Sequence, residues 1–266
     1  MSLNMYLGET DEQKTSMNAV CTQMIVAMES MQSSIHTFTW NQTLRGHAYS
    51  SAKTYMSSMF LPLTRGVIYL CEELIRQNNR YPTDFRAEVS TTDVIEEEVI
   101  AQIEEIDRMI ARFQEQDEVL PLLSLRIPIY EGMKRTLQKK LFDLRTFNTT
   151  TGSNYAIAMK LAANVMEGLS QIQNNTVFNQ ATGMFTTKEI DMDWVDNLEE
   201  SQREAIVAEY EYDHPEDAQK VTEFLASLEE QDSKEIKYLM YTADEPYRTL
   251  AMQYVDRLEI ISLTKS

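Results

Sequence analysis

The chain has 266 residues, of which 42 are Asp or Glu and 24 are Lys or Arg, so its formal net charge is -18. This acidic balance repels phosphate backbones and anionic lipid headgroups, which argues against nucleic acid and membrane surfaces as partners. The length suits one large domain or two modest ones. With seven Gly and six Pro, the composition favours long helices over many short strands.

Two kinds of hydrophobic segment are not found in the sequence. No N-terminal stretch joins a basic start, an apolar core and a small-residue cleavage site, and no apolar run reaches about 18 residues. We therefore expect synthesis and folding in the cytoplasm, no stable membrane insertion, and no cleavable signal peptide. Export would need a route that recognises folded helices.

The first part of the chain predicts two amphipathic helices, over residues 9–39 and 47–78. Their apolar residues recur at alternating steps of three and four, which is typical of helices that pack along a seam. In the first helix these residues are Met17, Val20, Met24, Met28, Met31, Ile35 and Phe38. In the second they are Ala52, Tyr55, Met59, Leu63, Val67, Leu70 and Leu74. We expect Pro62 to kink the second helix and the segment 78–82 to end it.

Such a helical hairpin has more apolar surface than two helices can bury against each other. One interpretation assigns Met24, Met28 and Met31 to the hairpin core and the neighbouring strip of Ile25, Ala27 and Ile35 to a partner. The alternative is an ordinary hairpin core. Methionine suits both, because its unbranched side chain adapts to the surface it meets.

The turn between the two helices contains Trp40, Leu44 and Gly46. Glycine has no Cβ and can take a positive φ, so Gly46 is suited to a tight reversal. We expect Trp40 and Leu44 to plug the open end of the hairpin.

The two cysteines, Cys21 and Cys71, fall in different helices of this hairpin. If the chain reverses near Thr43 and Leu44, Cys21 faces Gly66, so the two cysteines are offset by about 7.5 Å along the helix axes. That offset makes a disulfide improbable, and we expect two buried thiols.

The rest of the chain also predicts helices. Asp93 and Glu96 have the spacing of a capping box, and Pro128 precedes another apolar repeat. Residues 174–187 lose the helical period, which indicates a small hairpin or an irregular turn. A helix then restarts at Asp193, with Trp194 as its anchor. The last segments read as short, acidic helices.

Catalytic and metal-binding motifs are not found. The sequence has no Gly-x-Ser-x-Gly elbow, no phosphate-binding glycine loop and no Cys-x-x-Cys pair. A single Glu-x-x-His occurs at Glu211 and His214, whereas carboxylate-bridged metal sites use two. We predict no cofactor, no metal and no enzymatic activity.

Several segments together resemble the LXG domain of type VII secretion toxins from Gram-positive bacteria. They are Leu44-Arg45-Gly46 at the turn, residues 48–55, Pro62-Leu63, the segment 78–85 with Pro82, residues 182–185, and Asp193-Trp194. The LXG domain is itself similar to the small WXG proteins, whose hairpin turn carries Trp-x-Gly. The resemblance covers about residues 1–195.

The resemblance implies an all-α fold, with an elongated, WXG-like hairpin extended by further long helices and followed by a small C-terminal helical unit. Residues 1–195 would form the targeting domain, and residues 196–266 an acidic helical spacer or pre-toxin module. In this family the LXG domain binds small α-helical adaptor or chaperone proteins encoded nearby, and the type VII secretion ATPase recognises the complex. We therefore expect a non-enzymatic targeting region of a secreted antibacterial toxin, without its toxic domain.

Four residues are candidates for the partner-binding face: Ile25, Ile35, Tyr49 and Tyr55. Phe113 and Asp117 are a weaker candidate for a secretion signal, because type VII signals place an aromatic residue and a carboxylate one helical turn apart. In LXG systems that motif is expected on the partner. Two other functions stay open: a self-associating helical scaffold, and a metal-dependent enzyme in the C-terminal unit.

Overall fold

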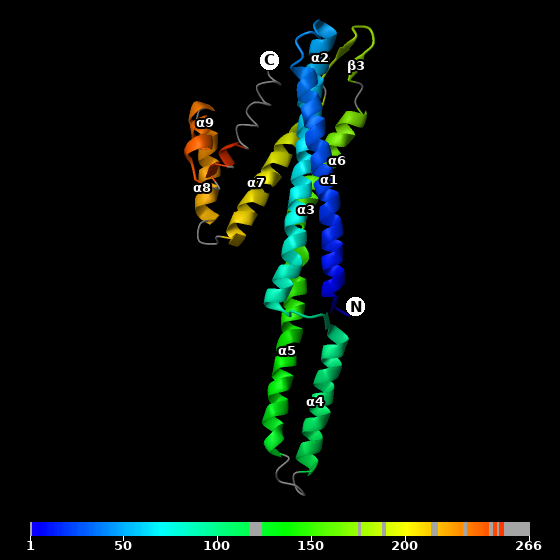
Figure 1. Cartoon of the computed structure of the whole chain (residues 1–266), viewed down its shortest axis with the longest axis vertical. Coiled ribbons are helices and arrows are strands. Elements are labelled where there is room, and N and C mark those ends of the chain that lie inside the picture. Colours follow the sequence, from blue (N-terminus) through cyan, green and yellow to red (C-terminus); the bar gives the residue numbers. More distant parts are fainter. Residues whose placement is uncertain are drawn as a thin grey trace. The chain divides into compact units, whose positions relative to one another are not determined.

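The computed structural model describes residues 2–116, 124–174, 177–187, 190–213, 218–230, 233–244, 247–248 and 250–252. These residues are mostly helical, which confirms the predicted all-α class (Figure 1). The helices are α1 (Leu7–Thr39), α2 (His47–Tyr55), α3 (Leu61–Glu88), α4 (Glu96–Gln116), α5 (Ile127–Thr150), α6 (Ala156–Asn174), α7 (Asp193–Asp213), α8 (Ala218–Glu230) and α9 (Ser233–Thr242).

Shorter elements join these helices. They are the strands β1 (Asn4–Met5), β2 (Val94–Ile95), β3 (Phe178–Asn179) and β4 (Met184–Phe185), a π-helical turn η1 (Met56–Phe60), and the 3-10 turns η2 (Ser124–Arg126) and η3 (Thr151–Ser153). The chain divides into two compact units, one of residues 1–20 and 74–155 and the other of residues 21–73 and 156–266.

The second arm of the hairpin differs from its prediction. It is helical from His47 to Glu88 through α2, η1 and α3, so the expected end at residues 78–82 is wrong. Pro82 lies inside α3, although a proline there removes a backbone donor at a cost of about 3 kcal/mol. Pro82 and Phe85 are both almost fully buried, and this packing offsets the lost hydrogen bond. The π-helical turn η1 directly precedes the α3 segment that holds Pro62.

In the first unit, the N-terminal segment is fixed by the residues that begin α4. Strands β1 and β2 pair antiparallel, with Met5 opposite Val94. The Leu7 amide, at the start of α1, donates to Asp93 Oδ1 at 2.8 Å. The Leu3 amide donates to Glu96 Oε2 at 2.9 Å, and the Glu96 amide donates back to the Leu3 carbonyl at 3.0 Å. The predicted capping box is therefore wrong: α4 begins at Glu96 itself, and the Glu96 amide that Asp93 would cap bonds to Leu3. The two carboxylates accept amides of the N-terminal segment instead.

The core of the first unit lies beside this junction. It joins residues from β1, α1, α3, β2, α4 and α5, namely Met5, Leu7, Phe85, Val94, Val99, Leu144 and Phe147. The rings of Phe85 and Phe147 meet edge to face, with centroids 5.3 Å apart. Helices α4 and α5 run side by side away from this core (Figure 1).

In the second unit, α6 and α7 cover the hairpin arm that contains α2, η1 and α3. Their shared core consists of Tyr55, Met59, Leu63, Leu161, Val165, Ile190, Trp194 and Leu198. Two residues of α7 each pack on a glycine: a Cβ on Gly168 would lie 2.8 Å from the Trp194 ring, and one on Gly66 would lie 2.8 Å from Leu198 Cδ2. Trp194 is 2% exposed, as expected of an anchor.

Two further features complete the second unit. Strands β3 and β4 form a hairpin whose turn includes Gly183, with a φ of 66°, which confirms the hairpin alternative for this segment. A smaller core joins Leu228, Ile236 and Ala251 of the C-terminal part. The predicted division at residue 195 stays a prediction, and α7 runs through that position.

The contact between Gly168 and Trp194 gives a stability prediction. Gly168→Ala places a methyl group against the indole, and we expect a loss of about 1–2 kcal/mol in the free energy of unfolding. Gly132→Ala is the matched control, because Gly132 is also inside a helix and nothing lies within 4 Å of its added Cβ. We expect the control to be neutral or stabilising by up to about 1 kcal/mol. Urea denaturation of both variants measures the difference, and equal effects would contradict this packing.

The junction at Glu96 gives a pH prediction. The Leu3 amide, and after it the Arg145 guanidinium at 2.7 Å, hold the pKa of the Glu96 carboxyl below its usual 4.5. The folded state therefore favours the carboxylate. Its contribution to stability is fully present above about pH 4.5 and is lost as the pH falls through the lowered pKa.

We expect Glu96→Gln to destabilise the chain by about 1–3 kcal/mol at pH 7, because a neutral amide makes weaker bonds to both donors. The difference from the unmodified chain should shrink as the pH falls below about 4. Denaturation midpoints at pH 7 and at acid pH test this. A deficit that stays constant with pH would show that Glu96 acts through packing alone.

Candidate functional site

The turn between α1 and α2 is held by polar side chains. Asn41 Oδ1 accepts hydrogen bonds from the Thr43 amide at 2.9 Å and the Thr43 hydroxyl at 2.6 Å. Lys53 of α2 donates to the Asn41 carbonyl at 2.6 Å, and Arg45 donates to the Gln42 carbonyl at 2.7 Å. These bonds tie the end of α1 to α2 without an apolar plug.

The predicted role of Gly46 in the turn is confirmed. Its φ is 107° and its ψ is 163°, a combination that is essentially confined to glycine. The Gly46 carbonyl accepts the first hydrogen bond of α2, from the Ser50 amide at 2.9 Å. Nothing lies within 4 Å of an added Cβ, so the backbone conformation, and not space, requires glycine here.

The expectation that Trp40 plugs the hairpin is wrong. Its side chain is 79% exposed, whereas Leu44 is half-buried. Trp40 follows the last residue of α1 and continues its hydrogen-bonding pattern, with its amide on the His36 carbonyl at 2.9 Å. The indole therefore lies beyond the packed part of α1. The turn next to it is held by the hydrogen bonds of Asn41 and Arg45, and not by apolar packing.

Two segments that carried the family resemblance meet at this end of the second unit. The Phe185 amide of β4 donates to Ser51 Oγ of α2 at 3.0 Å. The Phe185 ring stacks on Tyr55, with centroids 5.3 Å apart and an interplanar angle of 16°. Because Trp194 shares a core with Tyr55, the separated motifs around residues 51, 185 and 194 form one structural unit.

The predicted partner-binding residues lie in different environments. Ile35 is 3% exposed and Tyr55 is 7% exposed, so both pack inside the chain. Ile25 is half-buried, and Tyr49 is exposed. A partner-binding role for these four residues stays a prediction.

The apolar stripe on α1 agrees with its expected position only in its second half. Ile35 of the stripe is buried as expected, whereas Met17, Val20 and Met24 are 46%, 62% and 41% exposed and Cys21 beside them is buried. The sequence places apolar residues on two adjacent strips of the helix, so its periodicity alone does not decide which strip faces inward.

The weaker candidate pair is only partly described. Phe113 is half-buried and its ring centroid lies 5.3 Å from that of Tyr130. Asp117 lies outside the described residues. A signal role for Phe113 and Asp117 stays a prediction.

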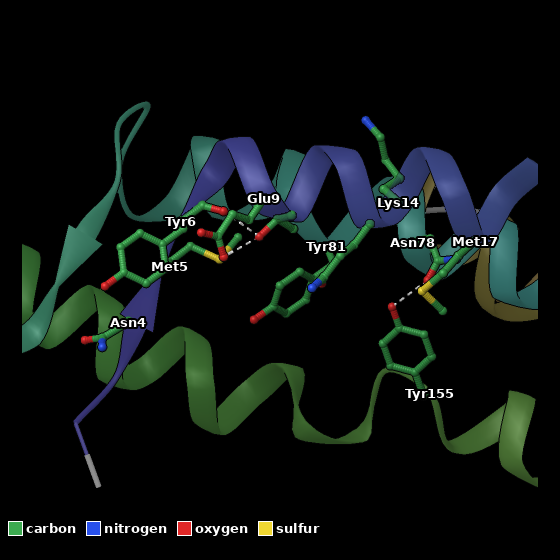
Figure 2. Close-up of a pocket in the computed structure, with 11 residues that line it drawn as sticks. Asn4, Met5, Tyr6, Glu9, Lys14, Met17, Asn78, Tyr81 and Tyr155 are labelled. Atoms are coloured by element: carbon green, nitrogen blue, oxygen red, sulfur yellow. Dashed lines mark hydrogen bonds between the residues drawn. The ribbon is translucent and has the colours of Figure 1, made fainter.

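The first unit also contains a groove that sequence reasoning missed. It has a volume of about 370 Å³ and is lined by Asn4, Met5, Tyr6, Glu9, Thr10, Gln13, Lys14, Met17, Asn78, Tyr81 and Tyr155. Figure 2 shows Tyr81 and Tyr155 on one side of the α1 ribbon. The sequence does show one wall of the groove, as the helical spacing of Tyr6, Thr10, Gln13 and Met17. It does not show that Tyr81 and Tyr155, from distant segments, complete the lining.

Hydrogen bonds fix the polar end of this groove. The Tyr155 hydroxyl donates to Asn78 Oδ1 at 2.9 Å (Figure 2), and the Asn78 amide group donates to Asn18 Oδ1 at 3.0 Å. Burial raises the pKa of the Tyr81 phenol, and burial together with Tyr81 raises that of Tyr155. Both hydroxyls are therefore neutral at physiological pH and act as hydrogen-bonding groups.

The described residues offer neither a metal site nor a membrane-spanning helix. Within the described ranges, no group of three or more His, Cys, Asp or Glu side chains is placed to hold a metal ion. His214 of the Glu-x-x-His motif lies outside those ranges. Among the helices that the structure describes, none is long and apolar enough to cross a bilayer.

Comparison with known proteins identifies the N-terminal part of the chain. Residues 7–120 match the family model of the LXG domain of the WXG superfamily. These residues are an LXG domain. The match confirms the resemblance drawn from the turn and the second helix, and it covers α1, the LXG turn, α2, α3 and α4.

A named relative extends the comparison beyond the LXG domain. A Bacillus cereus protein named "Toxin" is 43% identical to this chain over 201 residues. The aligned part is 75% of this chain and 37% of the relative, so the chain matches little more than a third of that protein's length.

The conformation of Gly46 predicts how the LXG turn responds to substitution. We expect Gly46→Ala to lower the free energy of unfolding by about 1–3 kcal/mol, because alanine disfavours this backbone conformation. Gly8→Ala is the control: Gly8 also has open space around its Cβ position, but its φ is ordinary. Thermal or urea unfolding of the two variants compares them, and an unaffected Gly46→Ala variant would refute the conformational requirement.

Proposed function

We propose that this chain is the targeting region of a secreted antibacterial toxin and has no enzymatic activity of its own. The observation that carries the proposal is the LXG domain over residues 7–120, supported by the relative named "Toxin". The targeting region would bind small α-helical adaptor proteins. The resulting complex would be recognised by the type VII secretion ATPase and exported without a cleavable signal peptide.

The most suitable partner surface is one flank of α1 in the first unit. We call it the α1 flank and define it as Tyr6, Thr10, Gln13, Met17 and Val20. The steps of four and three place these side chains on one face of the helix, and the first four line the groove. Tyr6, Met17 and Val20 are 39%, 46% and 62% exposed.

A partner helix fits this surface better than an extended peptide does. An amphipathic helix offers apolar residues at the same steps of three and four, so its ridge lies along Met17 and Val20. Its side chains would reach the groove, where the hydroxyls of Tyr81 and Tyr155 satisfy polar atoms. The strands that the structure describes in this unit are only two residues long, which leaves little edge for strand addition.

The adjacent strip of α1 is occupied by the chain itself. Asn18 bonds to Asn78 and Asn79 of α3, and Asp11 forms an ion pair with Arg86. The α1 flank is therefore a neighbouring, largely exposed strip beside this helix pair. A third helix placed there would bury apolar surface at about 25 cal/mol per Å², before the costs of association are subtracted.

Co-purification with small helical proteins encoded beside the gene tests the partner proposal. We expect a stable complex with the unmodified chain. Met17→Glu combined with Val20→Glu should weaken it at least tenfold, because two charges would enter an apolar contact, and about 1.4 kcal/mol corresponds to each factor of ten.

Met159→Glu combined with Met166→Glu is the matched control, since these methionines of α6 are also exposed, at 72% and 65%. The control should bind normally, and circular dichroism should show that both double variants stay folded. Equal binding by the two double variants would exclude the α1 flank. If the chain stays a monomer and binds none of the candidate partners, or if light scattering shows symmetric self-association, the proposal that it binds adaptor proteins would be contradicted.

A further inference from the structure

One end of the second unit is free of acidic residues. The sequence stretches 30–71 and 168–188 contain no Asp or Glu, although 42 of the 266 residues of the chain are acidic. The two stretches meet in the fold, because β4 packs against α2. We call residues 30–55 and 177–187 the acid-free end, and Figure 1 shows it at the end of the unit that holds α2 and β3.

The positive charges of this end are not neutralised by its surroundings. Arg45 and Lys53 donate to backbone carbonyls, and among the described residues no carboxylate pairs with either of them. The nearest acidic residue along α1 is Glu29, about 15 Å from Thr39 at 1.5 Å per residue. Salt screens charges beyond about 8 Å at physiological ionic strength. The acid-free end therefore keeps a local positive charge in a chain that is strongly acidic as a whole.

Aromatic side chains are exposed at the same end. Trp40, Tyr49 and Phe178 are 79%, 46% and 44% exposed. They come from three separate segments, namely the end of α1, α2 and β3, and so they do not form the stripe along one helix that a partner helix would contact. Tryptophan and tyrosine are enriched at the headgroup level of membranes, because each has an apolar ring and a polar group. This arrangement suits a lipid interface better than a helical partner.

We infer that the acid-free end is a docking surface for a bilayer of anionic phospholipids. Trp40 would place its ring in the headgroup region, and Tyr49 and Phe178 would add contacts around it. Arg45 and Lys53 would face lipid phosphates, and no carboxylate of this end would repel those phosphates. The contact is peripheral and reversible, because two cations and three aromatic side chains give much less attraction than an inserted helix does.

The net charge of the chain argues against this contact only if the charge is evenly distributed. The acidic residues lie outside the acid-free end, so the chain can approach an anionic surface in one orientation. The inference goes beyond the proposed function, since the α1 flank belongs to the first unit and the acid-free end to the second. Lipid binding is measured on the purified chain alone, so its failure is distinguishable from a failure of adaptor binding or export.

Tryptophan fluorescence of the purified chain with lipid vesicles tests the inference. The chain has two tryptophans, and Trp194 is almost fully buried, so a change on binding reports on Trp40. With vesicles of phosphatidylglycerol and phosphatidylcholine in equal parts, we expect a blue shift of the emission and weaker quenching by acrylamide. Pure phosphatidylcholine vesicles should give a much smaller change. Unchanged emission with the anionic vesicles, or an equal change with both lipids, would overturn the inference.

An aromatic substitution and its control locate the contact. Trp40→Ala should lower the partition coefficient for the anionic vesicles by roughly tenfold, because one large ring no longer leaves water. Tyr241→Ala is the matched control, since Tyr241 of α9 is 84% exposed but lies outside the acid-free end. The control should bind normally in a vesicle sedimentation assay. Equal binding by the two variants would exclude Trp40 from the contact and overturn the inference.

Added acidic residues test the role of charge. Gln42→Glu combined with Gln180→Glu puts two carboxylates on exposed positions of the acid-free end and should lower the partition coefficient by roughly tenfold or more. Gln114→Glu combined with Gln138→Glu changes the net charge equally on exposed positions of α4 and α5 and should have little effect. Equal losses in both double variants would overturn the inference.

An acidic protein is the other class of partner that a positive surface could bind, and polyglutamate serves as its probe. Binding of polyglutamate that Trp40→Ala abolishes, with no binding to anionic vesicles, would overturn the inference in favour of such a protein. Circular dichroism shows whether each variant stays folded. The fluorescence of the unmodified chain decides the inference even if a variant does not fold.

Discussion

The arrangement of the second unit depends on close packing between α7 and two glycines. Trp194 packs on Gly168 of α6, and Leu198, one helical turn later, packs on Gly66 of α3. A side chain at either glycine would push α7 outward and open the core that includes Tyr55 and Met59. The hairpin arm formed by α2, η1 and α3 is thus packed against later segments of the same chain, because Gly168 lets the Trp194 indole approach and Gly66 lets Leu198 approach.

This covering is unequal between the two arms of the hairpin. The second arm contributes Met59, Leu61 and Leu63, all nearly inaccessible, to the interior. The first arm keeps Met17, Val20 and Met24 exposed along one strip of α1. The apolar surface that the hairpin cannot bury within itself is therefore covered on the second arm and stays partly exposed on α1. A partner, if it binds as proposed, meets the arm on which an apolar strip stays exposed among the described residues.

Much of this fold follows from local chemistry in the sequence. The end of α1, the positive φ of Gly46, the small hairpin at Gly183 and the start of α7 at Asp193 each depend on a turn or cap residue that acts where it stands. The LXG segments were likewise recognisable. The sequence did not predict which segments pack against each other, such as the ring of Phe185 on that of Tyr55, because no local pattern encodes a contact between distant residues.

The wrong predictions have a common physical cause, which is packing that outweighs local preference. Pro82 remains in α3 because its ring is buried beside Phe85, and burial exceeds the cost of one lost backbone bond. The inward strip in the first half of α1 was misassigned because residues 20 and 21, and likewise 24 and 25, offer apolar side chains on adjacent strips. The groove beside α1 escaped detection since Tyr81 and Tyr155 reach it from separate segments.

Asp93 and Glu96 show how a local signal can have a nonlocal use. Their spacing predicts a capping box, but α4 begins only at Glu96, and Asp93 does not cap it. Yet their carboxylates accept the Leu7 and Leu3 amides, more than eighty residues away in the sequence. A carboxylate near the start of a helix can accept a hydrogen bond from any backbone amide within reach. The pairing of β1 with β2 brings the Leu3 and Leu7 amides within reach of Glu96 and Asp93. Glu96 therefore begins one helix and holds Leu3, while Asp93 fixes the first residue of α1 and with it the position of the α1 flank.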